Sequence, residues 1–174
     1  MNTQRRTVSI ATCGMVLVLL SAARFVAADP HASLSTRNAR AACTFLGTGD
    51  ATTALGVPSQ PGKQFIDSAG CVWSNDPAAS DSSRRVILNT HSPAAFGFAA
   101  HPAITTIRIE PVAGIGDEAF YQIYPGDASP FIWVRKGTVA FSIRILTRLK
   151  PSPFTNDQEK AKEAVLARAA VARI

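Results

Sequence analysis

The sequence contains few of the residues from which metal centres and reactive sites are built. Its 174 residues include 3 cysteines, 3 histidines, 2 tryptophans and 2 tyrosines. Cys43 and Cys71 are too few for a four-ligand zinc site, and no histidine lies near them at ligand spacing. These scarcities argue against a metal centre, and we expect no cofactor.

Long apolar runs are equally rare, and the one that exists marks an export signal. Residues 10–23 carry no charge, follow the basic pair Arg5-Arg6 and precede the small residues Val26-Ala27-Ala28. The run is shorter than the roughly 20 residues of a membrane span, but the pattern is typical of a cleavable signal peptide. We therefore predict a signal peptide over residues 1–28, a periplasmic or secreted location by the general or the twin-arginine route, and no transmembrane segment in the mature chain.

A concentrated basic patch is also missing. The chain carries a formal net charge of +6, from 18 basic and 12 acidic residues. Arg5, Arg6 and Arg24 belong to the signal, so the mature chain keeps 15 basic residues and a net charge of +3. The remaining basic residues are scattered, whereas nucleic-acid binding favours a clustered patch with stacking partners. We therefore expect no nucleic-acid partner.

Two cysteines remain once Cys13 leaves with the signal. If the chain is exported as predicted, Cys43 and Cys71 lie in an oxidising compartment. They enclose a loop of about 29 residues. The chain-entropy model gives such a crosslink about 3.5 kcal/mol. We predict one disulfide, Cys43–Cys71.

The mature chain has the length and patterning of one α+β domain. Residues 29–38 are polar and predict a flexible leader, and residues 39–174 form the domain. Alternating apolar residues and capping signals predict helices over residues 48–55, 93–100 and 156–174, and strands over 71–73, 84–90, 105–110, 120–124, 131–135 and 138–146. This order predicts an antiparallel sheet with helices packed mainly on one face.

The last helix begins at a capping box, Thr155-Asn156-Asp157-Gln158. Val165, Ala169 and Ala172 form a narrow stripe of small apolar residues along it, which Leu166 widens. We predict that this stripe packs on the sheet.

Four motifs resemble those of a protein family. They are Cys43-Thr44-Phe45-Leu46, a helix ending Ala54-Leu55-Gly56, Cys71-Val72-Trp73, and Gly114-Ile115-Gly116-Asp117-Glu118-Ala119-Phe120. Their order and spacing are similar to those of small uncharacterised bacterial envelope proteins, many of them lipoproteins with a domain of unknown function. The resemblance implies an extracytoplasmic α+β domain with one disulfide, and it transfers no catalytic residue. Gly47 replaces the family's threonine, and the lipoprotein cysteine after the signal is missing, so membrane anchoring is not implied.

Candidate catalytic residues are sparse. Gly114 and Gly116 give an incomplete phosphate-loop motif followed by a strand, so we interpret them as a turn in which Asp117 bonds nearby backbone amides. His91 and His101 lie near the ends of the middle helix, and a hydrolase would need one of them beside a carboxylate such as Asp117 and a nucleophile such as Ser92.

Aromatic residues are the other candidates for a site. Trp73, Tyr121, Tyr124 and Trp133 lie on or next to predicted strands and could form a binding surface, although strand tryptophans more often belong to the core. Tyr121 and Tyr124 are three positions apart and should face opposite sides of their strand.

Three classes of function follow from these observations. The leading hypothesis is a non-enzymatic, monomeric domain that binds a small ligand or an envelope protein. The second is a small envelope hydrolase that uses His91 or His101. The third is an inhibitor or immunity-type protein that blocks a secreted enzyme with residues 75–83 or 124–130.

Overall fold

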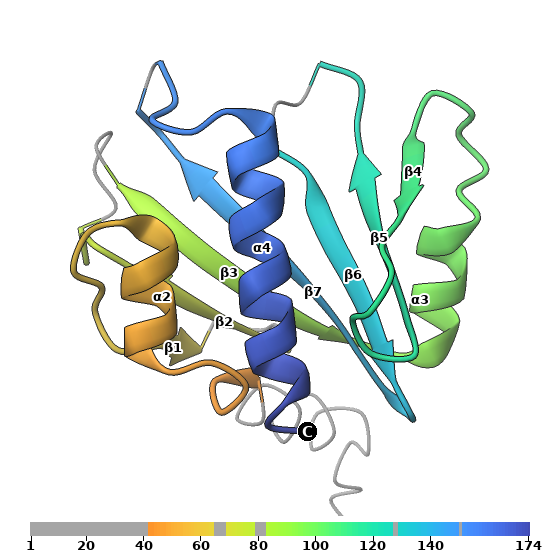
Figure 1. Ribbon diagram of the computed structural model, residues 1–174, viewed down its shortest axis with the longest axis horizontal. Helices are drawn as coiled ribbons and strands as arrows, with labels where there is room; N and C mark the ends of the chain where they lie inside the picture. Colours follow the sequence, from red (N-terminus) through yellow and green to blue (C-terminus); the bar gives the residue numbers. More distant parts are fainter. Residues whose placement is uncertain (1–41, 65–68, 79–82, 127–128, 150) are drawn as a thin grey trace, which may run out of the picture.

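An antiparallel sheet organises the chain (Figure 1). The computed structural model describes residues 42–64, 69–78, 83–126, 129–149 and 151–174. Within these ranges the sheet has seven strands in the order β1-β2-β3-β7-β6-β5-β4. The predicted signal peptide and leader lie outside the described residues.

The elements follow the predicted order with small differences in their bounds. The strands are β1 Lys63–Gln64, β2 Gly70–Ser74, β3 Arg84–His91, β4 Arg108–Pro111, β5 Glu118–Ile123, β6 Phe131–Lys136 and β7 Val139–Thr147, and the helices are α2 Thr48–Leu55, α3 Pro93–Ala100 and α4 Asn156–Val171. The two-residue β1 was not predicted. The strand predicted over residues 105–110 begins only at Arg108, because Ile107 N–H donates to Ile104 O in a preceding turn.

The topology consists of two meanders joined in the middle of the sheet. Strands β1 to β3 form one, and β4 to β7 form the other. After β3 the chain passes through α3 to β4 at the far edge, and the second meander returns until β7 pairs with β3 over eight register pairs. The last residue of β3 and the first turn of α3 therefore lie beside the β6–β7 hairpin.

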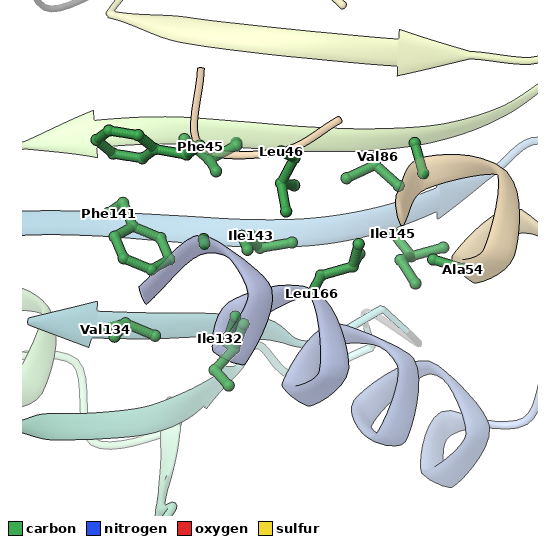
Figure 2. Close-up of a cluster of buried hydrophobic side chains, with 14 of the residues drawn as sticks. Phe45, Leu46, Ala54, Val86, Ile132, Val134, Phe141, Ile143, Ile145 and Leu166 are labelled. Atoms are coloured by element: carbon green, nitrogen blue, oxygen red, sulfur yellow. The ribbon is translucent and has the colours of Figure 1, made fainter. Parts of the chain in front are cut away.

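Helices α2 and α4 cover one face of the sheet and enclose the main core (Figures 1 and 2). Phe141, Ile143 and Ile145 of β7 are fully buried there, and Leu166 of α4 packs among them. Helix α3 covers the end of the opposite face, where Phe96 packs on Phe120 and Ala140. Two of the three helices in the described ranges thus share one face, as the sequence predicts.

The stripe predicted on α4 is correct for Leu166, which is buried, and for Ala169, which is partly buried against the core, but wrong for Val165 and Ala172. The helix buries Glu159, Glu163, Ala164, Leu166, Ala167 and Ala170. Val165 is instead 58% exposed, and Ala172 is also exposed. Both glutamates of the helix point into the protein, so its buried face is rotated away from Val165.

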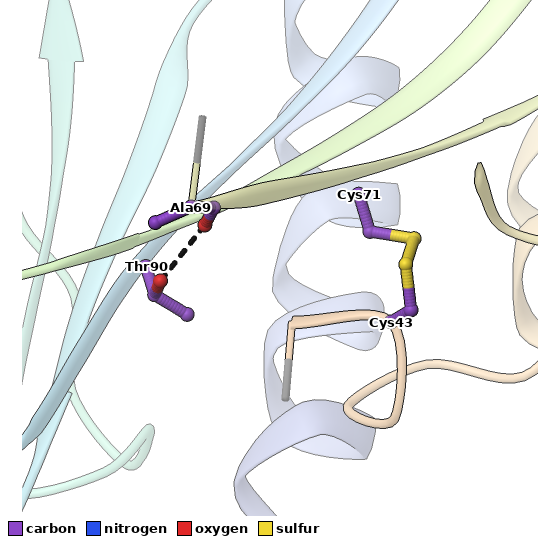
Figure 3. Close-up of a disulfide and its surroundings, with 4 residues drawn as sticks. All are labelled: Cys43, Ala69, Cys71 and Thr90. Carbon is purple, nitrogen blue, oxygen red and sulfur yellow. Dashed lines mark hydrogen bonds between the residues drawn. A yellow bond between two sulfur atoms is a disulfide. The ribbon is translucent and has the colours of Figure 1, made fainter. Parts of the chain in front are cut away.

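The predicted disulfide is present (Figure 3). Cys43, just before α2, is bonded to Cys71 in β2. Cys71 and Trp73 are both buried on the face that α2 covers. The crosslink therefore attaches the segment before the first described helix to the edge half of the sheet. Among the described residues, no helix has the length and apolarity to span a membrane.

Candidate functional site

A row of polar and aromatic side chains crosses the sheet face on which α3 lies. His91 ends β3, Ser142 is central in β7, Trp133 is in β6 and Gln122 is in β5. Trp133 and Ser142 are register partners, and Ser142 is also opposite Asn89, two residues before His91. Because alternate residues of a strand share a face, the four side chains meet there.

The contacts in this row fix the imidazole of His91. Its Nε2 is hydrogen-bonded to Ser142 Oγ at 2.8 Å, and its ring stacks on Trp133 with 4.2 Å between centroids. Trp133 Nε1 in turn donates to Gln122 Oε1 at 3.0 Å. Ser142 and Gln122 are both buried. The hydrogen bond with Ser142 and the stacking on Trp133 therefore hold the imidazole of His91 in one orientation, and Gln122 in turn holds Trp133.

Burial lowers the pKa of His91 to about 4. Desolvation disfavours the charged imidazolium, and no carboxylate bonds the ring among the described residues. The imidazole is therefore neutral at physiological pH, with one ring nitrogen engaged by Ser142.

A cavity of about 390 Å³ lies beside this histidine. It is lined by Phe45, Thr90, His91, Ser92, Pro93, Thr138, Val139 and Ala140. The lining combines three hydroxyl side chains and one imidazole with apolar walls, and it includes no charged side chain. Such a mixture suits an uncharged ligand with a few hydrogen-bonding groups.

The pair Ser142–His91 has the spacing of a nucleophile and a base, but its surroundings do not suit hydrolysis. Ser142 is only 3% exposed, so a substrate carbonyl cannot reach its Oγ. A base with a pKa of about 4 is far from the value near the working pH that efficient proton transfer favours. Ser92, the predicted nucleophile, instead accepts a hydrogen bond from Ala95 N–H as the N-cap of α3.

Of the other two proposed catalytic residues, Asp117 is occupied elsewhere and His101 lies in a different hollow. Asp117 accepts hydrogen bonds from Gly137 N–H at 2.7 Å and Lys136 Nζ at 3.0 Å, and these bonds lower the pKa of its carboxyl. Asp117 thus accepts from a backbone amide, as predicted, but this amide belongs to the β6–β7 hairpin, 20 residues along the chain. His101 lines a separate hollow of about 310 Å³ with Glu118, whose carboxylate is paired with Arg135 at 3.0 Å.

The four aromatic residues predicted for a binding surface are divided between the two faces. Trp73 and Tyr121 are buried under α2 and α4, and Tyr121 Oη donates to Lys160 O. Trp133 and Tyr124 belong to the other face, where Tyr124 is exposed and packs edge-on against Phe131. Of the four, only Trp133 contacts His91.

Two residues of the site were missed by sequence reasoning. Ser142 and Gln122 lie within strands, where a polar residue on the lightly covered face is ordinary. The one available signal was the position of Ser142 between the apolar residues Phe141 and Ile143 of its strand. The loops proposed for an inhibitor, 75–83 and 124–130, include residues outside the described ranges.

A second hollow lies between α2 and α4. It measures about 300 Å³ and is lined mainly by apolar side chains of α4, among them Val165 and Ala169. Asp50 and Lys162 stand in the same lining, and Asp50 is paired with Arg173 at 2.8 Å.

The chain matches no protein-family model, no curated protein and no solved structure. Fold and site together define an α+β sheet domain with one disulfide and a neutral, partly polar cavity at the end of its third strand.

Proposed function

We propose that this protein is an exported, non-enzymatic binding domain that takes a small uncharged ligand in the cavity at His91. The observation that carries the proposal is the fixed, neutral imidazole beside a cavity without charged walls. A preformed hydrogen-bonding group lowers the entropic cost of binding, because it need not be ordered by the ligand.

The size and chemistry of the cavity support this class of ligand. A volume of about 390 Å³ falls in the range of small-molecule sites. Phe45, Pro93 and Val139 supply apolar contact, while Thr138 and His91 supply hydrogen-bonding groups. A charged ligand would lose hydration without gaining an opposite charge from this lining.

Export is supported by two features of the chain. The first 28 residues have the pattern of a cleavable signal peptide. The disulfide between Cys43 and Cys71 fits an oxidising compartment such as the periplasm or the outside of the cell.

Binding is tested by screening the mature protein against a library of uncharged amides, sugars and alcohols, with thermal shift and isothermal titration calorimetry as readouts. Thr138→Trp fills the cavity from an exposed position on its wall, and Lys136→Trp is the matched control on the same hairpin outside the lining. We expect a hit whose affinity falls at least tenfold in Thr138→Trp and His91→Phe. Lys136→Trp and His101→Phe should bind as the unsubstituted protein does.

Two results would contradict the proposal. One is a library that shifts neither readout. The other is a ligand that binds Thr138→Trp and His91→Phe with unchanged affinity, which would place its site elsewhere.

A further inference from the structure

Two glutamates lie on the buried face of α4. Glu159 and Glu163 are one helical turn apart and are 2% and 0% exposed. Buried carboxylates are normally paired with a cation or fully hydrogen-bonded, because an unpaired buried charge is costly. The surroundings of Glu163 meet neither condition.

The carboxyl of Glu163 has one hydrogen-bond partner in the part of the chain that the structure describes. Its Oε1 accepts from Ile145 N–H at 2.9 Å, while Oε2 is buried without a partner. The pairing of β6 with β7 ends at Ile132 and Ile143, so Ile145 of β7 has no partner residue in β6. Glu163 thus satisfies a backbone amide that the neighbouring strand leaves open, and it ties α4 to the sheet at this point.

Arg144 and Lys160 offset the charge of Glu163 only in part, and burial outweighs them. On α4, Glu159 is a second acid, and Lys160 is bound to Glu110 of β4. On β7, the guanidinium of Arg144 lies over the Phe131 ring at 4.3 Å. On β5, Tyr121 donates to Lys160 O, and Arg168 of α4 lies near Tyr121. Among the described residues, no cation is within ion-pair distance of Glu163.

We propose that the docking of α4 on the sheet is coupled to a proton: Glu163 carries a proton while the helix is packed and releases it to water when the helix leaves the sheet. The protonated acid keeps an acceptor for Ile145 N–H and places no charge in the core. Rising pH then favours the state in which the carboxylate is hydrated, and the helix loosens.

The direction of the effect follows from the pKa of Glu163. Burial, the largest cause, raises this pKa well above its ordinary value, and the charge of Glu159 adds to the increase. The folded protein therefore holds a proton that the unfolded chain has lost, and the stability it brings is lost as pH rises. Between the unfolded and folded pKa values, the unfolding constant should rise about tenfold per pH unit from this one group.

Glu163→Gln is the decisive variant, because glutamine copies the shape and the acceptor of the protonated acid. Urea unfolding of the mature protein and of Glu163→Gln is measured from pH 5 to pH 9. We expect the stability advantage of Glu163→Gln to grow with pH. His91 changes stability with the opposite sign below pH 6.5, but it is present in both proteins and cancels in their difference. Glu118→Gln, at an exposed acid of β5, is the matched control and should show no such pH dependence.

A second measurement keeps the proposal falsifiable if Glu163→Gln folds poorly. Carbon NMR of the unsubstituted protein, with the glutamate carboxyls labelled, follows the titration of Glu163 directly. A Glu163 carboxyl that stays protonated well above the ordinary glutamate range, with faster amide exchange in α4 as it ionises, supports the coupling. Titration near the ordinary glutamate value, or a difference between Glu163→Gln and the unsubstituted protein that does not change with pH, overturns it.

Discussion

At the residue scale, the turn before β5 depends on the backbone conformation of two glycines and on the hydrogen bonds of one aspartate. Gly114 and Gly116 have φ values of 75° and 61°, in the region that only glycine enters without strain. At Gly114 a Cβ would meet open space, whereas at Gly116 it would lie 2.5 Å from Arg135 O. This close approach lets Asp117 reach the β6–β7 hairpin and accept from Gly137 N–H.

The two glycines should therefore differ when each is replaced by alanine. Gly114→Ala should cost about 1–2 kcal/mol of unfolding free energy, from the left-handed backbone alone. Gly116→Ala should cost at least about 3 kcal/mol, because the backbone of Arg135 must also move. Chemical denaturation of both variants measures the difference, and equal losses would show that the contact with Arg135 O is not limiting.

At the scale of elements, α4 has a buried and an exposed face that its apolar residues alone do not define. Leu166 is 1% exposed and packs in the main core, while its neighbour Val165 is 58% exposed. The buried face runs through Glu159 and Glu163 at its start and through alanines at its end. The helix is positioned by polar contacts to the sheet as well as by hydrophobic burial.

Alanine substitution of Leu166 and of Val165 should distinguish the buried face of α4 from its exposed face by the loss of stability. Leu166→Ala should cost about 2–5 kcal/mol, because it removes buried atoms and leaves a cavity. Val165→Ala should change the free energy by no more than about 0.5 kcal/mol, as expected of an exposed position. Thermal or urea unfolding of each variant measures the change, and a loss in Val165→Ala as large as in Leu166→Ala would contradict the orientation of α4.

At the scale of the whole molecule, the disulfide joins two segments that lie 28 residues apart in the sequence. Cys43 precedes α2, and Cys71 lies in β2 on the outer side of β3. Arg173, near the other end of the chain, donates to Phe45 O and pairs with Asp50. The segment before α2 is thus held from both sides, by β2 and by the end of α4.

Reduction of the disulfide should lower the stability of the protein by about 3.5 kcal/mol and its melting temperature by roughly 10 °C. The double variant Cys43→Ser/Cys71→Ser should reproduce this loss without a reductant. Calorimetry in the oxidised and reduced states measures it, with thiol titration as the control. An unchanged melting temperature with both thiols free would mean that the bond contributes nothing to stability.

The sequence determined much of the local structure. The cap of α2 at Gly56, the Ser92-Pro93 start of α3 and the capping box of α4 all depend on neighbouring residues, and the structure has each of them. The disulfide between Cys43 and Cys71 could also be predicted, because Cys13 falls in the segment predicted to be a signal peptide and the other two cysteines allow one pairing. The alternation of β7 fixed which of its residues are buried beneath α4. Such features are readable because their causes lie within a few positions along the chain.

The site was decided only by the tertiary structure. His91, Ser142 and Trp133 come from three strands, and the pairing of β7 between β3 and β6 brings them together. No local pattern encodes that register, so Ser142 could not be assigned to His91 in advance. Glu163 shows the same limit, since its burial depends on the open amide of Ile145 beyond the end of a neighbouring strand. Local sequence therefore set the elements, and long-range strand pairing set which polar groups share a buried environment.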